Sequence, residues 1–222
     1  MKRSKKYNEM KKRISNTVYQ SPLEALEILV SSSLSKFPGS VEVEVQLALN
    51  QKQKTESIRG TVHLPHQFGK VTRVVAFADP ANIKFAKNAD LSGGEEMVKD
   101  IEDGKIEFDV VVATPAMMPK IARLGKTLGK KGLMPNPKNG TVTTDLEKTI
   151  EKFKSGQKSF KLAQEKKINF VIGKTDMTPA ELEDNFNTFV NAVKETTKKF
   201  GPSVIDIIRV KPTMGPSLLI KS

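Results

Sequence analysis

The stretch Val41–Leu49, VEVEVQLAL, decides one half of the fold, because apolar and polar side chains alternate along it without interruption. Successive side chains of a β-strand point to opposite faces of the sheet, so this period of two predicts a strand with one buried face and one wet face. A second candidate strand, Ile58–Leu64, ends at Pro65. This part of the chain is therefore predicted to form a sheet with a core on one side.

A different pattern begins after Pro65. The runs Val71–Ala78 and Phe108–Thr114 are short and almost continuously apolar, and helical segments follow each of them. Strands that are covered on both faces have this composition in parallel β-α-β arrangements. The middle of the chain is therefore predicted to be a parallel α/β unit.

Helix starts and a return of the alternating pattern complete the chain. Ser21–Glu24 and Thr178–Glu181 have the pattern of a capping box with proline at the first helical position, and Thr144–Glu147 predicts another capped start. The remaining predicted strands lie at Ile168–Ile172, Val204–Val210 and Ser217–Ile220. This order of patterns predicts one α+β domain, residues 1–66 and 158–222, that is split by an inserted α/β domain at 67–157.

Charge is distributed unevenly between these two predicted domains. The whole chain carries +12, whereas the split domain alone has 22 basic and 13 acidic residues, a net +9. Seven of those basic residues lie within residues 1–13, which hold a single acid, Glu9. Such an excess favours a polyanionic partner, a nucleic acid or an anionic membrane surface, and it assigns the main contact to the split domain.

Several kinds of site are disfavoured by composition. The chain has no cysteine and two histidines, His63 and His66, so thiolate nucleophiles and disulfides are excluded and zinc sites are improbable. No apolar run approaches the roughly 20 residues of a membrane helix, and no signal peptide follows the basic N-terminus. No catalytic residue, metal or cofactor is predicted, and no membrane partner.

The strongest enzymatic alternative is a nucleotide-binding protein built on the inserted domain. Gly125-Lys126-Thr127 is similar to the end of a P-loop, whose backbone N–H groups bind phosphates. That motif needs a glycine where Lys120 stands. A basic DNA-binding protein of architectural type is a third hypothesis.

Two short motifs admit both a structural and an RNA-binding interpretation. Phe37 beside Lys36 can close a helix as a core aromatic, or its ring can pack on a ribose or a base while the lysine meets a phosphate. Thr213–Pro216 can be a plain turn between strands, or its threonine can offer a hydroxyl to a 2′-OH while Gly215 permits close approach.

A third motif lies in the inserted domain. Gly132–Gly140 is dense in glycine, proline and asparagine, which is typical of a rigid surface loop. Residues 120–138 around it hold six basic residues and no acid. The loop could therefore also contact phosphates, and the predicted secondary basic patch consists of Lys126, Lys130, Lys131 and Lys138.

These motifs, in this order and spacing, resemble the large-subunit ribosomal protein L-one family in its bacterial type over nearly the whole chain. The resemblance is carried by Ser35–Phe37 with Val41–Val43, Arg59–His66, Gly93–Glu96, Phe108–Pro115, Gly132–Lys138 and Thr213–Ser217. It implies a split α+β sandwich domain that grips ribosomal RNA, with an inserted Rossmann-like three-layer α/β domain hinged to it.

The resemblance also implies the partners and the contact residues. The partners would be large-subunit ribosomal RNA in the mobile stalk, deacylated tRNA at the exit site and, in some members, the messenger of the protein's own operon, whose translation is repressed. The location would be a ribosome of the cytoplasm or of an organelle. The implied RNA-binding residues are Lys36, Phe37, Ser40, Lys161, Gln164, Lys166, Lys167, Asn169, Thr213, Met214, Gly215, Pro216 and Ser217.

This sequence departs from the family pattern at a few of these positions. Gln164 stands where the family has a lysine, and Asn169 stands where it has a histidine. Lys130 and Lys131 occupy a position where the family commonly has proline, which adds charge to the loop. The individual contacts at Gln164 and Asn169 are therefore expected to differ from those of other members.

Overall fold

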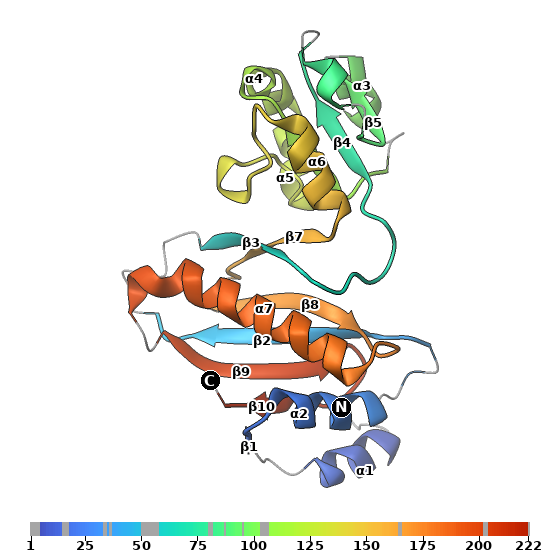
Figure 1. The fold of residues 1–222 in the computed structure, drawn as a ribbon, viewed down its shortest axis with the longest axis vertical. Helices are drawn as coiled ribbons and strands as arrows, with labels where there is room; N and C mark the ends of the chain where they lie inside the picture. The colour runs from blue at the N-terminus through green and yellow to red at the C-terminus, as the bar shows by residue number, and fades with distance from the viewer. Residues whose placement is uncertain are drawn as a thin grey trace. The chain divides into compact units, whose positions relative to one another are not determined.

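The structure, a computed structural model, describes residues 5–14, 18–32, 35, 37–49, 58–79, 82–86, 88–94, 96–102, 107–163, 166–201 and 204–221 (Figure 1). The chain divides into two compact units. The first joins Met1–Gly69 to Ser159–Ser222, and the second is Lys70–Lys158. Each unit has a hydrophobic core of its own.

A mixed five-stranded sheet is the frame of the first unit, in the order β1-β10-β9-β2-β8. The alternating stretch forms the central strand β2, which pairs antiparallel with β8 and β9. Strand β10 is antiparallel to β9, and β1 is parallel to β10. The bounds are Val18–Tyr19 (β1), Ser40–Leu47 (β2), Lys167–Lys174 (β8), Ile205–Pro212 (β9) and Leu218–Ile220 (β10).

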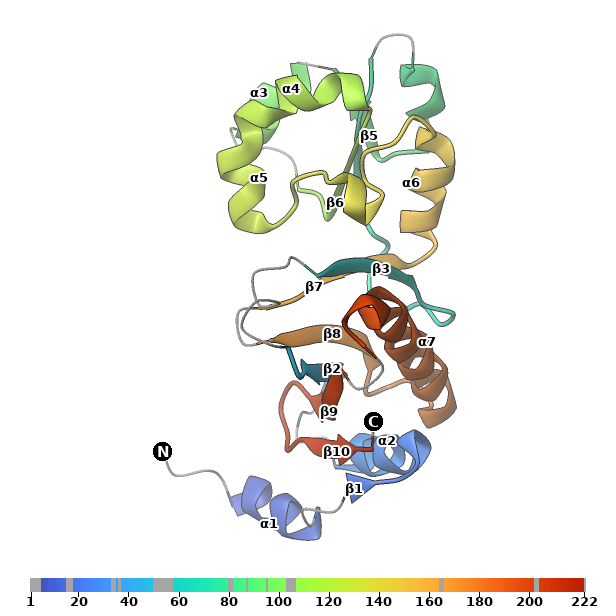
Figure 2. The same ribbon diagram turned by 90° about the vertical axis from the view of Figure 1, so that its left-hand side faces the viewer.

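Two helices, α2 (Pro22–Ser31) and α7 (Pro179–Thr197), lie side by side on one face of this sheet (Figure 2). The apolar half of β2, which includes Val43 and Val45, is fully buried beneath them. Burial of this stripe stabilises the unit, at roughly 25 cal/mol per Å² of apolar surface removed from water. The other helical segments of the unit are α1 (Lys5–Arg13) and η6 (Lys198–Phe200).

A two-stranded ribbon, β3 (Arg59–His63) with β7 (Gln157–Lys161), packs against α7. Phe160 of the ribbon meets Phe170 and Phe189 edge-on, with ring centroids 6.5 and 5.7 Å away, and those two rings stack at 4.6 Å. Gly60 makes room for this cluster, because a Cβ there would lie 2.5 Å from the Phe160 ring. The ribbon is thereby fixed to the helix.

The second unit is built on a three-stranded parallel sheet in the order β5-β4-β6. One face packs on α3, α4 and α5 through side chains such as Ile121 and Leu128, and the other packs on α6 through Ile150 and Phe153. Because both faces are covered, β4 is buried along its whole length, as continuous apolar runs predict.

The strands of this unit are β4 (Val74–Phe77), β5 (Leu91–Gly93) and β6 (Val110–Ala113). The α-helices are α3 (Glu96–Glu102), α4 (Met118–Ile121), α5 (Gly125–Lys131) and α6 (Leu146–Lys154). Short 3-10 turns complete the unit at η2 (Ile83–Ala86), η3 (Pro115–Met117), η4 (Ala122–Leu124) and η5 (Pro137–Asn139).

The capping predictions have different outcomes. At α7 the full capping box forms, since Thr178 and Glu181 each accept from the other's backbone N–H. At the other two starts a helix does begin, but the predicted side-chain cap does not form. Ser21 has no side-chain cap bond although Pro22 begins α2 as expected, and α6 begins at Leu146 with Asp145, not Thr144, at the N-cap.

Candidate nucleic-acid interface

The face of the five-stranded sheet opposite α2 and α7 carries a strip of polar side chains. Because side chains alternate along each strand, the residues between the buried valines of β2 point away from the helices and keep part of their surface in contact with solvent. Strands β8 and β9 add residues of the same face. We call this set the open face: Glu42, Glu44, Gln46, Lys167, Asn169, Arg209 and Lys211.

Glu44 is the centre of an ion-pair network across three strands. Its Oε1 lies 2.9 Å from Nη1 of Arg209 on β9 and 3.7 Å from Nζ of Lys167 on β8. Arg209 also donates to Oε1 of Gln46 at 3.2 Å. The side chain of Glu44 is only 16% exposed, so these charges are held with little freedom. A fixed array of donors and acceptors costs less ordering entropy when a ligand binds.

One end of the open face is joined to the turn between β9 and β10. The backbone N–H of Thr213 donates to the carbonyl of Ser40 at 2.9 Å. The Thr213 hydroxyl lies 3.2 Å from the same carbonyl and 2.9 Å from Oε1 of Glu42, which also pairs with Lys211 at 3.4 Å. Ser40 and Thr213, both predicted site residues, are therefore brought together.

The rest of the Thr213–Ser217 turn divides into exposed and buried positions. Met214 is 62% exposed, and Ser217 is also exposed. Pro216 is buried, so this predicted contact residue packs inside the unit. Gly215 turns tightly, because a Cβ there would lie 2.5 Å from Cγ of Pro212. The turn presents a thioether next to a hydroxyl.

Phe37 precedes β2 on the same end of the sheet. Its side chain is 67% exposed, so the core-aromatic interpretation was wrong. The Ser35 hydroxyl donates to the Phe37 carbonyl at 2.7 Å, and the Gly39 N–H donates to the Thr175 hydroxyl at 3.0 Å. An aromatic ring is therefore held in solvent by a fixed backbone. Lys36 lies outside the described residues.

The stretch from Lys161 to Asn169 does not act as one group. Lys167 and Asn169 lie on the open face, whereas Lys161 is exposed at the end of β7. Lys166 has a positive φ of 60°, and its Nζ donates to the carbonyl of Leu49 at 2.5 Å, so this ammonium closes the loop before β8. Gln164 lies outside the part of the chain that the structure describes.

The acidic and basic partners on the open face were not predicted as site residues. Glu42, Glu44 and Gln46 were interpreted only as the wet side of a strand, and Arg209 and Lys211 received no role. The alternation placed them on one face correctly. What it lacked was the strand order, which sets Arg209 opposite Glu44 in register.

Comparison with known proteins identifies the family of this chain. The model of the ribosomal protein L1p/L10e family matches residues 29–216, which include Phe37, the open face and Thr213. The chain belongs to this family. It is 38% identical to the large ribosomal subunit protein uL1 of Acidothermus cellulolyticus over 98% of this chain and 92% of the relative. The proteins of the same name from Streptomyces coelicolor and Lactobacillus delbrueckii subsp. bulgaricus are each 37% identical, over 99% and 100% of this chain and 86% and 90% of their own lengths.

This family member has a second basic surface, on the other unit. The nearly continuous helical run from η3 to α5 buries Met117, Ile121, Leu124 and Leu128. Exposed cations occupy the outer side of that run, and we call them the basic stripe: Lys120, Arg123, Lys126 and Lys130. The side chains of Lys131 and Lys138 lie outside the described part.

The same helical run contains the glycine-lysine-threonine motif on which the nucleotide-binding alternative depends. Gly125, Lys126 and Thr127 lie inside the first turn of α5, which follows another helical turn. A P-loop instead connects a strand to a helix and presents its backbone N–H groups to phosphate. Gly125-Lys126-Thr127 therefore does not form a P-loop, in agreement with the missing glycine at Lys120.

The loop Gly132–Gly140 is a rigid connection with an inward-facing part. The Thr141 hydroxyl accepts from the Asn136 N–H at 2.7 Å and donates to the Asn136 carbonyl at 3.1 Å. Gly132 and Gly140 both have left-handed φ values, 72° and 66°. Leu133 and Met134 pack on the core beside α5, which favours the structural interpretation of the motif.

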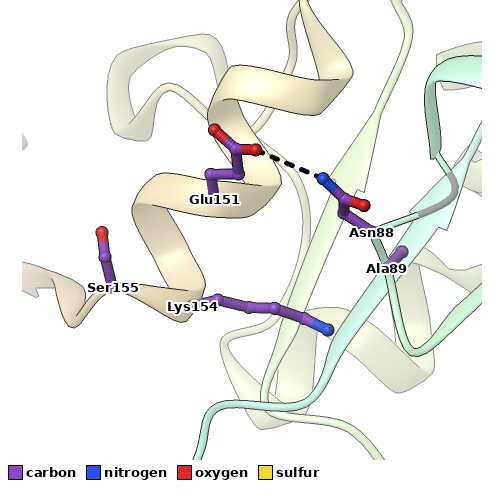
Figure 3. Close-up of a pocket in the computed structure, with 5 residues that line it drawn as sticks. All are labelled: Asn88, Ala89, Glu151, Lys154 and Ser155. Carbon is purple, nitrogen blue, oxygen red and sulfur yellow. Dashed lines mark hydrogen bonds between the residues drawn. The ribbon is translucent and has the colours of Figure 1, made fainter.

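A hollow of about 620 Å³ lies beside the C-terminal half of α6 (Figure 3). Its polar groups are engaged with one another, because Asn88 donates to Glu151 at 3.3 Å and Lys154 donates to Asp90 at 3.2 Å. The Val74 N–H donates to Asp90, and this bond, followed by Lys154, lowers the pKa of that carboxyl. The residues stabilise the start of β4.

Two further observations concern only the described residues. Nowhere among them do three or more His, Asp or Glu side chains gather as metal ligands would. No helix in the described ranges has the length and apolar character needed to cross a membrane.

Proposed function

We propose that this protein is a component of the large ribosomal subunit and binds ribosomal RNA through the open face and the two loops at its edge. The observation that carries the proposal is the hydrogen bond between the Thr213 N–H and the Ser40 carbonyl. This bond holds the Thr213 hydroxyl and the exposed side chain of Met214 at the edge of the open face. Phe37, which is also exposed, lies on the loop that precedes β2, the strand that begins at Ser40.

Each element of this surface suits a different part of RNA. An exposed aromatic ring can stack on an unpaired base, and such stacking contributes about 1–3 kcal/mol per base. The Thr213 hydroxyl and the Glu42 carboxylate are positioned as partners for a 2′-OH, which distinguishes RNA from DNA. Lys167 and Lys211 supply positive charge for phosphate groups.

The split domain, residues 1–66 and 158–222, is the proposed RNA-binding domain, and 67–157 is the proposed insert. By family resemblance, the complex would be the mobile stalk near the exit site, where the protein assists release of deacylated tRNA. Repression of its own operon messenger would use the same surface. The relatives' shared name, large ribosomal subunit protein, supports a place on the ribosome, and the proposed location of that ribosome is the cytoplasm or an organelle.

A mobility-shift titration of the full chain tests the proposal. The probe is a structured fragment of large-subunit ribosomal RNA, and the competitor is a random duplex of equal length. We expect preference for the fragment, with affinity that falls as salt rises because bound counterions are released. Equal affinity for the random duplex would contradict specific recognition.

A matched pair of charge variants locates the surface. Lys211→Gln removes a cation from the open face, and Lys194→Gln removes an exposed cation from α7 on the opposite, helical side. We expect the first to weaken binding of the fragment and the second to leave it nearly unchanged. A larger loss of binding in Lys194→Gln than in Lys211→Gln would indicate that the RNA contacts the helical side.

A further inference from the structure

One fully buried side chain in the first unit is an amide. Asn185 of α7 is 0% exposed, and every polar atom of its side chain is used. Its Oδ1 accepts from the backbone N–H of His66 at 3.0 Å, and its Nδ2 donates to the His66 carbonyl at 2.9 Å and to the Ile172 carbonyl at 2.8 Å. Three main-chain groups on two different segments are therefore held by one residue.

The first of these segments is a β-bulge in strand β8. In the pairing of β2 with β8, Val41 faces Gly173 and Glu42 faces Val171, so Ile172 has no residue opposite it. A bulge leaves its extra residue outside the regular ladder. The Asn185 amide supplies a partner for the Ile172 carbonyl, directly beside the point where Glu42 enters the open face.

The second segment is the connection from β3 into the second unit. His66 follows Pro65 and is bound to α7 twice, by Asn185 at its backbone and by Asp184 at its ring, where Nε2 and Oδ2 are 3.1 Å apart. Phe68 packs on the same core. Gly69 then has a left-handed φ of 83°, with no atom within 4 Å of the place of a Cβ.

We infer that Asn185 is the positioning residue of the first of the two connections between the units. It fixes the pivot of that connection, at Gly69, relative to the bulged strand of the open face. The main chain is tied to the first unit through His66 and Phe68. The chain passes into the second unit directly after Gly69. Without the clamp, the connection could move from Pro65 onward.

The geometry requires an amide in particular. The site needs one acceptor for the His66 N–H and two donors for carbonyl oxygens, and only a side chain with both functions on one carbon meets this need. Aspartate would keep the acceptor and lose both donors. Leucine has similar bulk and would leave all three main-chain groups unpaired in a dry site.

Hydrogen exchange on the full chain gives the first test. In the wild type, we expect the His66 amide to exchange as slowly as amides in the middle of α7. In Asn185→Leu, or in Asn185→Ala if the leucine variant does not fold, the His66 N–H loses its acceptor and should lose at least about tenfold of its protection, while the α7 amides keep theirs. Fast exchange at His66 in the wild type would overturn the inference.

A distance measurement tests the pivot itself. The chain has no cysteine, so spin labels can be attached specifically at Glu147→Cys on α6 and Glu195→Cys on α7, both exposed. We expect a broader label-to-label distribution in the Asn185 variant than in the wild type. The control is Asn187→Leu, at an exposed position of the same helix, which should match the wild type.

Three results decide the second test. A broader distribution in the Asn185 variant alone supports the clamp. Identical distributions in all three proteins would overturn it, as would equal broadening in the Asn187 control. None of these readouts involves RNA, so failure of the proposed RNA binding would leave the conclusion about the clamp unchanged.

Discussion

The hydroxyl of Thr213 lies 2.9 Å from Oε1 of Glu42, and 171 residues of sequence separate the two. The same hydroxyl lies 3.2 Å from the Ser40 carbonyl. It has one proton and two acceptors, so it donates to one of them at a time and keeps a lone pair available. This pair joins the β9–β10 turn to the central strand at the edge of the open face.

Removal of the Thr213 hydroxyl is expected to weaken specific RNA binding. In Thr213→Val the shape is retained, while the bond to Glu42 and any bond to a 2′-OH are lost. One hydrogen bond contributes about 0.5–1.5 kcal/mol, so we expect roughly a threefold to tenfold rise in Kd for the ribosomal fragment. Filter binding measures it. Thr213→Ser keeps the hydroxyl, so it is the control and should stay near wild type; equal loss in both variants would show that the hydroxyl does not account for the effect.

Phe37→Leu is expected to weaken RNA binding without lowering stability. The ring is 67% exposed, so little of the folding free energy depends on it, whereas loss of a stacked base costs about 1–3 kcal/mol of binding. The measurements are a binding isotherm and a thermal melt of each protein. An unchanged Kd would show that Phe37 does not meet RNA, and a lowered Tm would indicate a packing role.

Local patterns predicted the longer strands and the long helix, because burial on one or both faces imposes a period on the sequence, but they did not predict the strands β1, β5 and β7. Val41–Leu49 and α7 show this. The predicted strand Val71–Ala78 was too long at its start, since Val71 is 73% exposed and β4 begins at Val74. Strand order was not predictable in this way. Glu44 meets Arg209 and Lys167 only because β9 and β8 flank β2, and that depends on tertiary packing.

The shape of a candidate contact loop was predictable where its own residues determine that shape. The Thr213 turn is such a case, since glycine and proline fix its shape locally. Lys166 shows the opposite, because its ammonium is used by the Leu49 carbonyl, a group 117 residues away. No role was predicted for Asn185, which lies inside α7. A buried asparagine among phenylalanines was the available signal, but its partners lie on other segments.

Neutralising the basic stripe is expected to reduce the salt dependence of tRNA binding. Lys126→Gln with Lys130→Gln removes two exposed cations of α5. If both meet phosphates, the slope of log K against log salt should fall by about 0.9 for each contact with duplex RNA. Deacylated tRNA titrations at several salt concentrations measure the slope. The control Lys148→Gln removes an exposed charge from α6. Equal slopes in all proteins would exclude the stripe from the contact.

Asp90 is expected to stabilise the second unit in a pH-dependent way. Its carboxylate accepts from the Val74 N–H at 2.8 Å and from Lys154 at 3.2 Å, and these bonds lower its pKa below the usual 3.8. A group with a lowered folded pKa contributes stability above its unfolded pKa and loses it as pH falls through the folded pKa. The side chain is 42% exposed, so solvent screening limits the contribution to about 0.5–1 kcal/mol.

The measurement is urea unfolding of wild type and Asp90→Asn at pH 6 and near pH 3. The asparagine variant cannot ionise, so we expect it to be less stable at pH 6 and the difference to shrink on acidification. Glu147→Gln is the control. It removes an exposed carboxylate from α6 that does not line the hollow. A difference that stays constant from pH 6 to pH 3 would mean that the charge of Asp90 does not matter. The side-chain amide would then have failed for geometric reasons, because it cannot accept at both oxygen positions that Val74 and Lys154 require.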